Sequence, residues 1–386
     1  NITKIRMPAA WDITRGDAAV TIAVIDSGVN LTHPDLQSKL TASSTWHDYV
    51  DSDNLPDDEN GHGTHVAGIV AAATNNSLGV AGVAWQCRIM PLRILNKDGE
   101  GSTASIISAV DLAVDQDADV INLSLGGKSP DALLQAAVDR AHNAGVVVVA
   151  AAGNKNVSKG ETDEPFYPAA YPKVIAVAAT DNANIVPVFS IRGDYVDVAA
   201  PGVNIISTLP GGYGLMSGTS MAAPHVSGLA ALILSINPTL TPAQIAAALK
   251  TTSTDIDVPG EDIASGYGLI NAPAALQTIP GVPLTITTSS LPAGRDGMAY
   301  EQALSAFGGT KPYTWSLVSG SLPSGLALSA AGVLSGTPAR AGSYSFTVRV
   351  RDAASKTADK QLSLIIDPPL VHEFSAGVTL ISFPYQ

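Results

Sequence analysis

Residues 20–28, Val-Thr-Ile-Ala-Val-Ile-Asp-Ser-Gly, form a continuous apolar run that ends on an acid and a turn. Such a run is typical of a strand in a parallel sheet that is covered on both faces. Similar runs follow at 89–95, 120–123, 146–150 and 174–177. Segments of helical period lie between them at 62–73, 102–116 and 131–144, and another begins at Ser220. This alternation predicts an α/β domain over residues 1–278, a parallel sheet with helices on both faces.

The pattern changes near residue 282. Short alternating runs at 284–287, 313–316 and 344–348 are separated by Gly and Pro turns, and the helical period disappears. These features predict a small all-β sandwich over residues 282–367. Two prolines in the segment 279–283 favour a short, stiff linker between the two domains. In the tail, residues 368–386, we expect the start of a further, truncated domain.

The composition is that of a globular protein, with 46% hydrophobic and 14% charged residues among 386. The net charge of −13 argues against a nucleic-acid partner, because nucleic-acid binders need a basic face. No apolar run is long enough to span a bilayer, and the chain does not start like a signal peptide. The single cysteine, Cys87, cannot form an internal disulfide, and its apolar neighbours indicate a small buried residue.

Three segments carry the residue types of nucleophilic catalysis. Asp26 ends the first strand, His62 opens a helix after Gly61, and Ser220 opens another helix after Thr219. Peptide hydrolysis by serine needs a hydroxyl that attacks, an imidazole that removes its proton and a carboxylate that orients the imidazole. A helix N-terminus suits the serine, because free N–H groups there face developing negative charge. Each segment alone is equally typical of a turn, a loop or a helix cap, but the three in this order favour catalysis.

Together, these segments resemble the three signature blocks of the subtilase family, in its thermitase and subtilisin branch, and the resemblance covers nearly all of residues 5–276. It implies a secreted serine endopeptidase of broad specificity that acts on protein or peptide substrates with an apolar or aromatic P1 residue. It gives Asp26 the orienting role, His62 that of general base and then acid, and Ser220 that of nucleophile. The family folds with a propeptide, so we expect this chain to be a processed form. A catalytically silent binding protein on the same scaffold is the alternative. His65 and His225, inside the predicted helices, are expected to be packing or hydrogen-bonding residues.

The oxyanion hole is predicted at Asn154, which follows a strand and can donate to a tetrahedral oxygen together with the backbone N–H of Ser220. The resemblance also implies two edges that hold an extended peptide as an additional strand. These edges are Gly99-Glu100-Gly101 and Ser124-Leu125-Gly126. Small residues, which suit a broad apolar side chain, line the first specificity pocket: Gly126, Ala151, Ala152 and Gly153. Two possibilities stay open for Phe166: its ring shortens this pocket, or the ring turns into the core.

The segment 47–59 is dense in acids, and their mutual repulsion is unfavourable unless a hard cation neutralises it. The resemblance to the thermitase branch implies a Ca²⁺ site there; a solvated acidic loop is the alternative. The implied ligands are Asp48, Asp51, Asp53, Asp57 and the carbonyl of Leu55.

A second Ca²⁺ site is implied at residues 74–80, by resemblance to the strong calcium loop of the family. Its implied ligands are Asp35, Asn76 and the carbonyls of Thr74, Leu78 and Val80. The family adds a ligand from a longer N-terminal arm than this chain has, so we expect either a weaker site or a mature N-terminus that lies upstream.

Residues 282–367 resemble the immunoglobulin-like domains of bacterial extracellular proteins, on stretches such as Gly308-Gly309-Thr310-Lys311-Pro312 and Leu334-Ser335-Gly336-Thr337-Pro338. The resemblance implies no binding site. The module could bind a surface or an insoluble substrate, or space the protease from another domain, and both possibilities stay open. Trp315 and Tyr313 are expected in its core.

Overall fold

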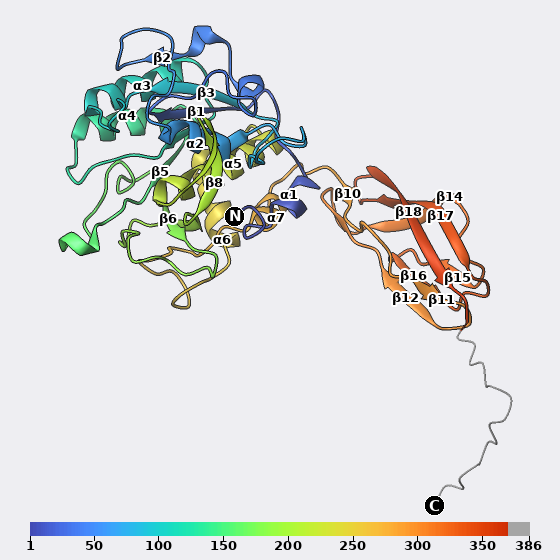
Figure 1. Ribbon diagram of the computed structural model, residues 1–386. Coiled ribbons are helices and arrows are strands. Elements are labelled where there is room, and N and C mark those ends of the chain that lie inside the picture. Colours follow the sequence, from blue (N-terminus) through green and yellow to red (C-terminus); the bar gives the residue numbers. More distant parts are fainter. Residues whose placement is uncertain (370–386) are drawn as a thin grey trace, which may run out of the picture. The chain divides into compact units, whose positions relative to one another are not determined.

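Seven parallel strands form one sheet in the first of two units into which the chain divides, between Val282 and Pro283 (Figure 1). The computed structural model describes residues 1–369. The strand order is β2-β3-β1-β4-β5-β6-β7, so β1 lies inside the sheet with β3 and β4 on either side. The strands are β1 Thr21–Asp26, β2 His47–Asp48, β3 Arg88–Arg93, β4 Val120–Leu123, β5 Val147–Ala151, β6 Val174–Thr180 and β7 Val198–Pro201.

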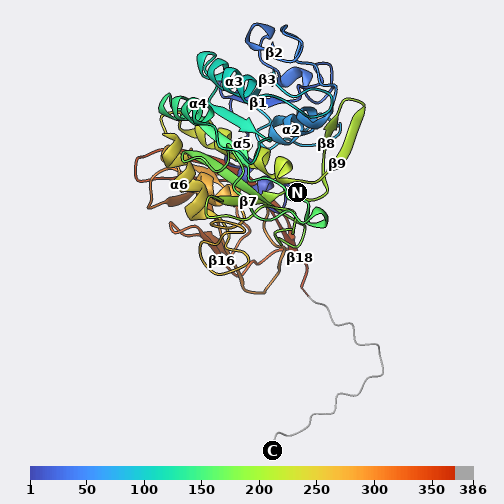
Figure 2. The same cartoon turned by 90° about the vertical axis from the view of Figure 1, so that its left-hand side faces the viewer.

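Helices cover both faces of this sheet, which confirms the predicted α/β class (Figure 2). Helices α2 (His62–Ala71) and α5 (Thr219–Ile236) pack together, and α5 contacts β4 to β7. Helices α3 (Thr103–Asp115) and α4 (Ala132–Asn143) bury their apolar sides in a separate cluster with alternate residues of the strands. Local sequence defines where α3 and α4 begin, because the side chain of Ser102 caps the N-terminus of α3 and that of Asp131 caps the N-terminus of α4.

The predicted strands and helices are present within a few residues of their expected ends, but two strands of the seven-stranded sheet, β2 and β7, were not predicted. Strand β2 has two residues, too few for a periodic signal, and the apolar segment of β7 lies in a region without helical neighbours in sequence. The remaining elements of this unit are α1 Met7–Trp11, α6 Pro242–Thr252, α7 Ala272–Gln277, the short 3₁₀ turns η1 Gln37–Lys39, η2 Ser43–Thr45 and η3 Val157–Lys159, and a hairpin of β8 Ile205–Leu209 and β9 Gly212–Met216.

One helix of the described residues, α5, is long and apolar enough to cross a membrane by length and composition. It is 83% buried inside the fold. An apolar helix enclosed by a sheet and by other helices is a core helix, so this length and composition reflect its place in the domain.

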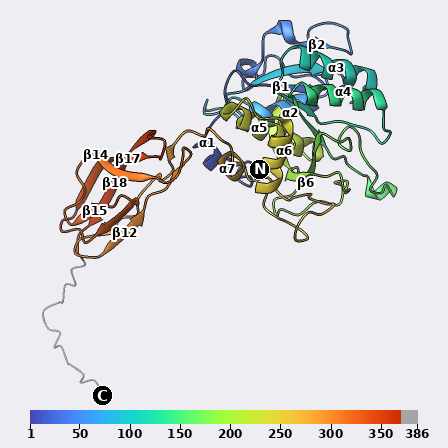
Figure 3. The same ribbon diagram turned by 180° about the vertical axis from the view of Figure 1, so that it is seen from behind.

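The second unit is all-β, as predicted, and its strands form two main sheets (Figure 3). One has the order β11-β18-β17-β14, the other has the order β12-β16-β15, and β10 pairs with β13. Trp315 belongs to the core of this unit, at 6% exposure, and Tyr313 packs against the same core. The prediction that both side chains are core residues is confirmed. The strands are β10 Thr285–Ile286, β11 Gly294–Arg295, β12 Tyr300–Ala303, β13 Ala306–Phe307, β14 Thr314–Gly320, β15 Leu326–Leu328, β16 Val333–Gly336, β17 Gly342–Arg351 and β18 Thr357–Asp367. The expectation of a further domain concerns a tail that lies, from residue 370 on, outside the described residues.

Candidate active site

Asp26 and His62 meet where the carboxyl end of β1 faces the first residue of α2. His62 Nδ1 lies 2.7 Å from Asp26 Oδ1, and the backbone N–H of Ser27 donates to the same oxygen at 2.8 Å. The Asp26 side chain is completely buried, whereas the His62 side chain is 25% exposed. A Cβ atom at Gly63 would lie 2.1 Å from the carbonyl oxygen of Gly28, so only glycine lets the helix approach the strand this closely.

The surroundings of His62 favour its protonated form. Burial is the largest influence and lowers the pKa, but the charge and hydrogen bond of Asp26 and the nearby charge of Asp58 raise it. The pKa of His62 therefore lies above its ordinary value. A buried carboxylate on Nδ1 also leaves Nε2 as the nitrogen that can exchange a proton with a ligand.

Ser220 is the second residue of α5 and is tied to the segment that follows β4. Its Oγ donates to the carbonyl of Ser124 at 3.1 Å, and Ser124 Oγ donates to the carbonyl of Ser220 at 2.8 Å. Within residues 1–369, no hydrogen bond joins Ser220 Oγ to His62, but both residues line one pocket of about 500 Å³. Hydrogen bonds between a nucleophile and its base commonly tighten only in the substrate complex.

Asn154 follows β5 and is oriented by the residue before Ser220. Its Oδ1 accepts from the N–H of Thr219 at 3.0 Å and from Thr219 Oγ1 at 3.2 Å. Both bonds use the amide oxygen, which leaves Nδ2 as the donor for a ligand in the pocket. The sequence did not indicate Thr219, because a threonine before the serine also fits an ordinary helix start.

Both predicted substrate edges and most of the predicted pocket walls line the pocket of His62, Ser220 and Asn154. Those residues are Gly99, Glu100, Gly101, Ser124, Leu125, Gly126, Ala151, Gly153 and Phe166. The prediction that Ala152 lines this pocket is wrong. Successive side chains of an extended chain point in opposite directions, so Ala151 faces the pocket and Ala152 lies in a buried cluster with Ala178 and Val196. Asn60, Leu95 and Ile106 complete the lining and were not predicted.

The ring of Phe166 lies between the two walls of this pocket. A Cβ atom at Gly126 would be 2.6 Å from Phe166 Cε1, and one at Gly153 would be 2.6 Å from Phe166 Cγ. The ring thus packs against both glycines and lines the cavity. The ring is therefore not turned wholly into the core, which was one of the two possibilities left open by the sequence.

The acidic segment before α2 is arranged around Arg93, at the end of β3. Arg93 Nη1 lies 2.9 Å from Asp48 Oδ2 and 2.8 Å from Asp51 Oδ2, and its Nη2 lies 2.6 Å from Glu59 Oε2. Asp53 Oδ1 instead accepts from the N–H of Leu55. The fourth implied carboxylate, that of Asp57, contacts the N–H of Leu31 at 3.4 Å. Of the four predicted carboxylates, only those of Asp48 and Asp51 share a partner, Arg93, and across residues 1–369 no group of three or more His, Cys, Asp or Glu side chains is placed to hold a metal ion.

The second implied calcium site brings Asp35, Asn76 and Val80 together. The Asp35 carboxylate is completely buried and accepts from Asn76 Nδ2 at 2.7 Å, from the N–H of Val80 at 3.2 Å and from the hydroxyl of Tyr213 at 2.9 Å. Thr74 and Leu78 belong to the same loop. A buried carboxylate, an amide and loop carbonyls are the oxygen donors that Ca²⁺ takes, so these residues fit a calcium ion.

The two other motif histidines and the cysteine are packing residues, as expected. His65 and His225 are completely buried and contact the carbonyls of Ile205 and Met221 through one ring nitrogen each. Burial lowers the pKa of His225 to about 3. Cys87 is buried and free.

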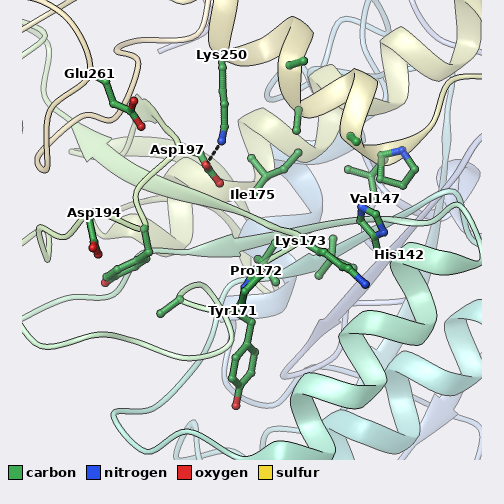
Figure 4. A pocket seen from close by; sticks show the side chains of 18 residues that line it. His142, Val147, Tyr171, Pro172, Lys173, Ile175, Asp194, Asp197, Lys250 and Glu261 are labelled. Carbon is green, nitrogen blue, oxygen red and sulfur yellow. Dashed lines mark ion pairs between the residues drawn. The ribbon is translucent and has the colours of Figure 1, made fainter.

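A larger cavity of about 800 Å³ lies at the amino ends of β5 and β6 (Figure 4). None of His62, Ser220 and Asn154 lines it. Its lining includes Tyr171, Lys173 and an ion pair of Lys250 with Asp197. Ligand sites of parallel sheets lie at the carboxyl ends of strands, where Asp26 and Asn154 are found. The smaller pocket is therefore the candidate active site.

Comparisons with known proteins agree with this geometry. The model of the subtilase family matches residues 17–268, and an Ig domain family matches residues 282–367. Subtilisin of Bacillus pumilus is 46% identical over 278 residues, which are 72% of this chain and 98% of that protein. Thermitase of Thermoactinomyces vulgaris is 46% identical over 275 residues, 71% of this chain and 94% of that protein. A thermophilic serine proteinase of Bacillus sp. (strain AK1) is 51% identical over 227 residues, 58% of this chain and 55% of that protein.

The family model covers more than half of the chain, and two relatives are matched over almost their whole length. Both resemblances expected from the sequence, to subtilases and to Ig-like domains, are confirmed. The chain belongs to the subtilase family and is a subtilisin-like serine endopeptidase.

Proposed function

We propose that Asp26, His62 and Ser220 are the catalytic triad, and that Asn154 Nδ2 and the backbone N–H of Ser220 form the oxyanion hole. The observation that carries this proposal is the 2.7 Å contact of His62 with a completely buried carboxylate, in a pocket that Ser220 and Asn154 also line. The start of α5 adds free N–H groups beside the serine.

The reaction follows from these positions. Ser220 Oγ attacks the scissile carbonyl carbon while His62 Nε2 takes its proton, and Asp26 stabilises the imidazolium through Nδ1. The raised pKa of His62 favours that charged state. Asn154 donates to the tetrahedral oxygen, and His62 returns the proton to the leaving amine, so that the acyl group stays on Ser220. Water then attacks this acyl group with His62 again as the base, and Ser220 is released.

The pocket favours a P1 side chain that is apolar and short. Gly126 and Ala151 offer apolar walls, but the Phe166 ring takes up the depth that an aromatic P1 ring would need. Of the apolar and aromatic preferences expected from the sequence, we therefore propose the aliphatic one, from Ala to Leu.

Hydrolysis of succinyl-Ala-Ala-Pro-X anilides by the wild type and by Ser220→Ala tests the triad. We expect activity that a serine-directed fluorophosphonate abolishes in the wild type and that is lost in Ser220→Ala. Activity that survives in the variant would mean that another residue is the nucleophile. A folded wild type without activity on any X would favour a silent binding protein.

We propose Ca²⁺ as a structural cofactor, held by Asp35, Asn76 and the carbonyls of Thr74, Leu78 and Val80. The fully buried Asp35 carboxylate supports this site. At the acidic segment, Ca²⁺ would have to draw Asp48 and Asp51 away from Arg93, so we expect weaker binding there. An ion that binds only the folded state raises its stability by mass action. Thermal unfolding of Ser220→Ala should therefore shift upward with Ca²⁺ and downward with EGTA, and Asp35→Asn should reduce that shift.

We also propose that the protein is extracellular, is made with a propeptide that is removed, and uses its Ig-like module either to bind a surface or an insoluble substrate or as a spacer. The family resemblance supports the first two points. Cell fractionation and N-terminal sequencing test them. Co-sedimentation of Ser220→Ala with insoluble proteins, with and without residues 283–386, tests the module.

A further inference from the structure

Asp58 lies four residues before His62 and is buried, at 8% exposure, although its neighbours Asp57 and Glu59 are exposed. Its Oδ1 accepts from Asn60 N at 3.0 Å and from Gly61 N at 2.8 Å. Its Oδ2 accepts from the backbone N–H and the hydroxyl of Thr64. Gly61 is the N-cap of α2 and has no side chain to bind the free N–H groups there, so Asp58 does this in its place.

A fifth hydrogen bond connects Asp58 to the strand that carries Asp26. Ser27 Oγ donates to Asp58 Oδ1 at 2.9 Å and accepts from the N–H of Gly63 at 2.9 Å. Ser27 N also donates to Asp26 Oδ1, the oxygen that contacts His62. The bonds close a ring that runs from Asp26 through Ser27 and Asp58 to the residues on both sides of His62.

The chemistry of this ring requires a carboxylate. All five partners of Asp58 donate, and a carboxylate can accept from all of them, whereas an amide would place two hydrogens against Thr64. The charge of Asp58 is also one of the influences that raise the pKa of His62. Asp58 does not line the substrate pocket.

We propose that Asp58 is a positioning residue of the reaction, which holds the end of β1 against the first turn of α2 and thereby fixes the contact between Asp26 and His62. This inference rests on the proposed triad. Because Asp58 does not itself line the pocket and contacts the pocket residue Asn60 only through its backbone N–H, its loss should affect mainly turnover and change KM little.

The test is the pH profile of Asp58→Asn, with kcat expressed per active site titrated by a fluorophosphonate. We expect kcat to fall about 10- to 100-fold, the effect of a small displacement of a catalytic group, with little change in KM. The acidic limb of kcat/KM should move to lower pH, because removal of the charge lowers the pKa of His62. Glu59→Gln is the matched control: it removes a charge one residue away that contacts Arg93, and it should move neither quantity.

A second variant keeps the inference falsifiable if Asp58→Asn does not fold. Ser27→Ala removes the middle of the ring but keeps the charge, so kcat should fall while the acidic limb stays in place. In the double variant the losses should be less than multiplicative, because both residues act through one link. Normal kcat per site and an unmoved limb in Asp58→Asn would overturn the inference, as would unchanged kcat in Ser27→Ala. Survival of activity in Ser220→Ala would instead overturn the triad on which it rests.

Discussion

Replacement of Phe166 by alanine should convert the enzyme to one that accepts aromatic P1 residues. The ring packs against Gly126 and Gly153, so its removal opens a slot between the two walls of the pocket. A P1 phenyl ring in that slot would bury about 100 Å² more apolar surface than a P1 methyl group, worth about 2.5 kcal/mol. Since about 1.4 kcal/mol is tenfold, the ratio of kcat/KM for P1 Phe over P1 Ala should rise about 60-fold.

The assay compares succinyl-Ala-Ala-Pro-Phe and succinyl-Ala-Ala-Pro-Ala anilides for the wild type and Phe166→Ala. Phe189→Ala is the control, because Phe189 lines a different hollow beside Asn154 and should leave the ratio unchanged. A ratio that stays within about threefold of the wild type would mean that the ring does not limit the pocket, and the proposed P1 preference would be wrong.

Three further predictions concern the oxyanion hole, acid stability and the acidic segment. Asn154→Ala should lower kcat about 100- to 1,000-fold at unchanged KM, the range for removal of such a donor in a subtilisin, and a loss below tenfold would contradict the proposed role. His225 has a pKa of about 3 in the fold, below its unfolded value, so it contributes stability above pH 6.5 that is lost as the pH falls toward 3. In urea unfolding of Ser220→Ala, the free energy of unfolding should fall by about 3 kcal/mol between pH 8 and pH 4 on account of His225. The added substitution His225→Gln should make this dependence on pH smaller. In the same assay without Ca²⁺, Arg93→Met should lower the free energy of unfolding by about 3–5 kcal/mol, because the buried Asp48 carboxylate loses its positively charged partner. A decrease below about 1 kcal/mol would contradict the buried ion pair of Arg93 with Asp48.

The α/β fold and the candidate triad could be predicted because their signals are local. The strand that ends at Asp26 is apolar from Ile22 to Ile25, and the helices that begin at His62 and Thr219 each follow a glycine. Each of these features is contained in fewer than ten successive residues, and the chain order of the three segments supplied the rest.

The parts that could not be predicted depend on contacts between distant segments. Arg93 follows the last residue of the acidic segment, Glu59, by 34 residues, and no local pattern pairs it with Asp48. Asp58 is one acid among several in that segment, and only the fold shows that its carboxylate accepts from the N–H groups at the start of α2. Ala152 was assigned to the pocket because alanine is compatible with either side of an extended chain.

Helix α5 has a consequence for how such an enzyme can be altered by evolution or in the laboratory. Fifteen of its eighteen residues are buried, and a Cβ atom at Gly228 would lie 2.7 Å from the side chain of Val83. Most substitutions along this helix therefore harm folding before they can change chemistry. Three pocket-lining positions outside helices, Glu100, Leu125 and Phe166, are not buried, so a random library directed at them should retain far more functional members than one of equal size directed at α5.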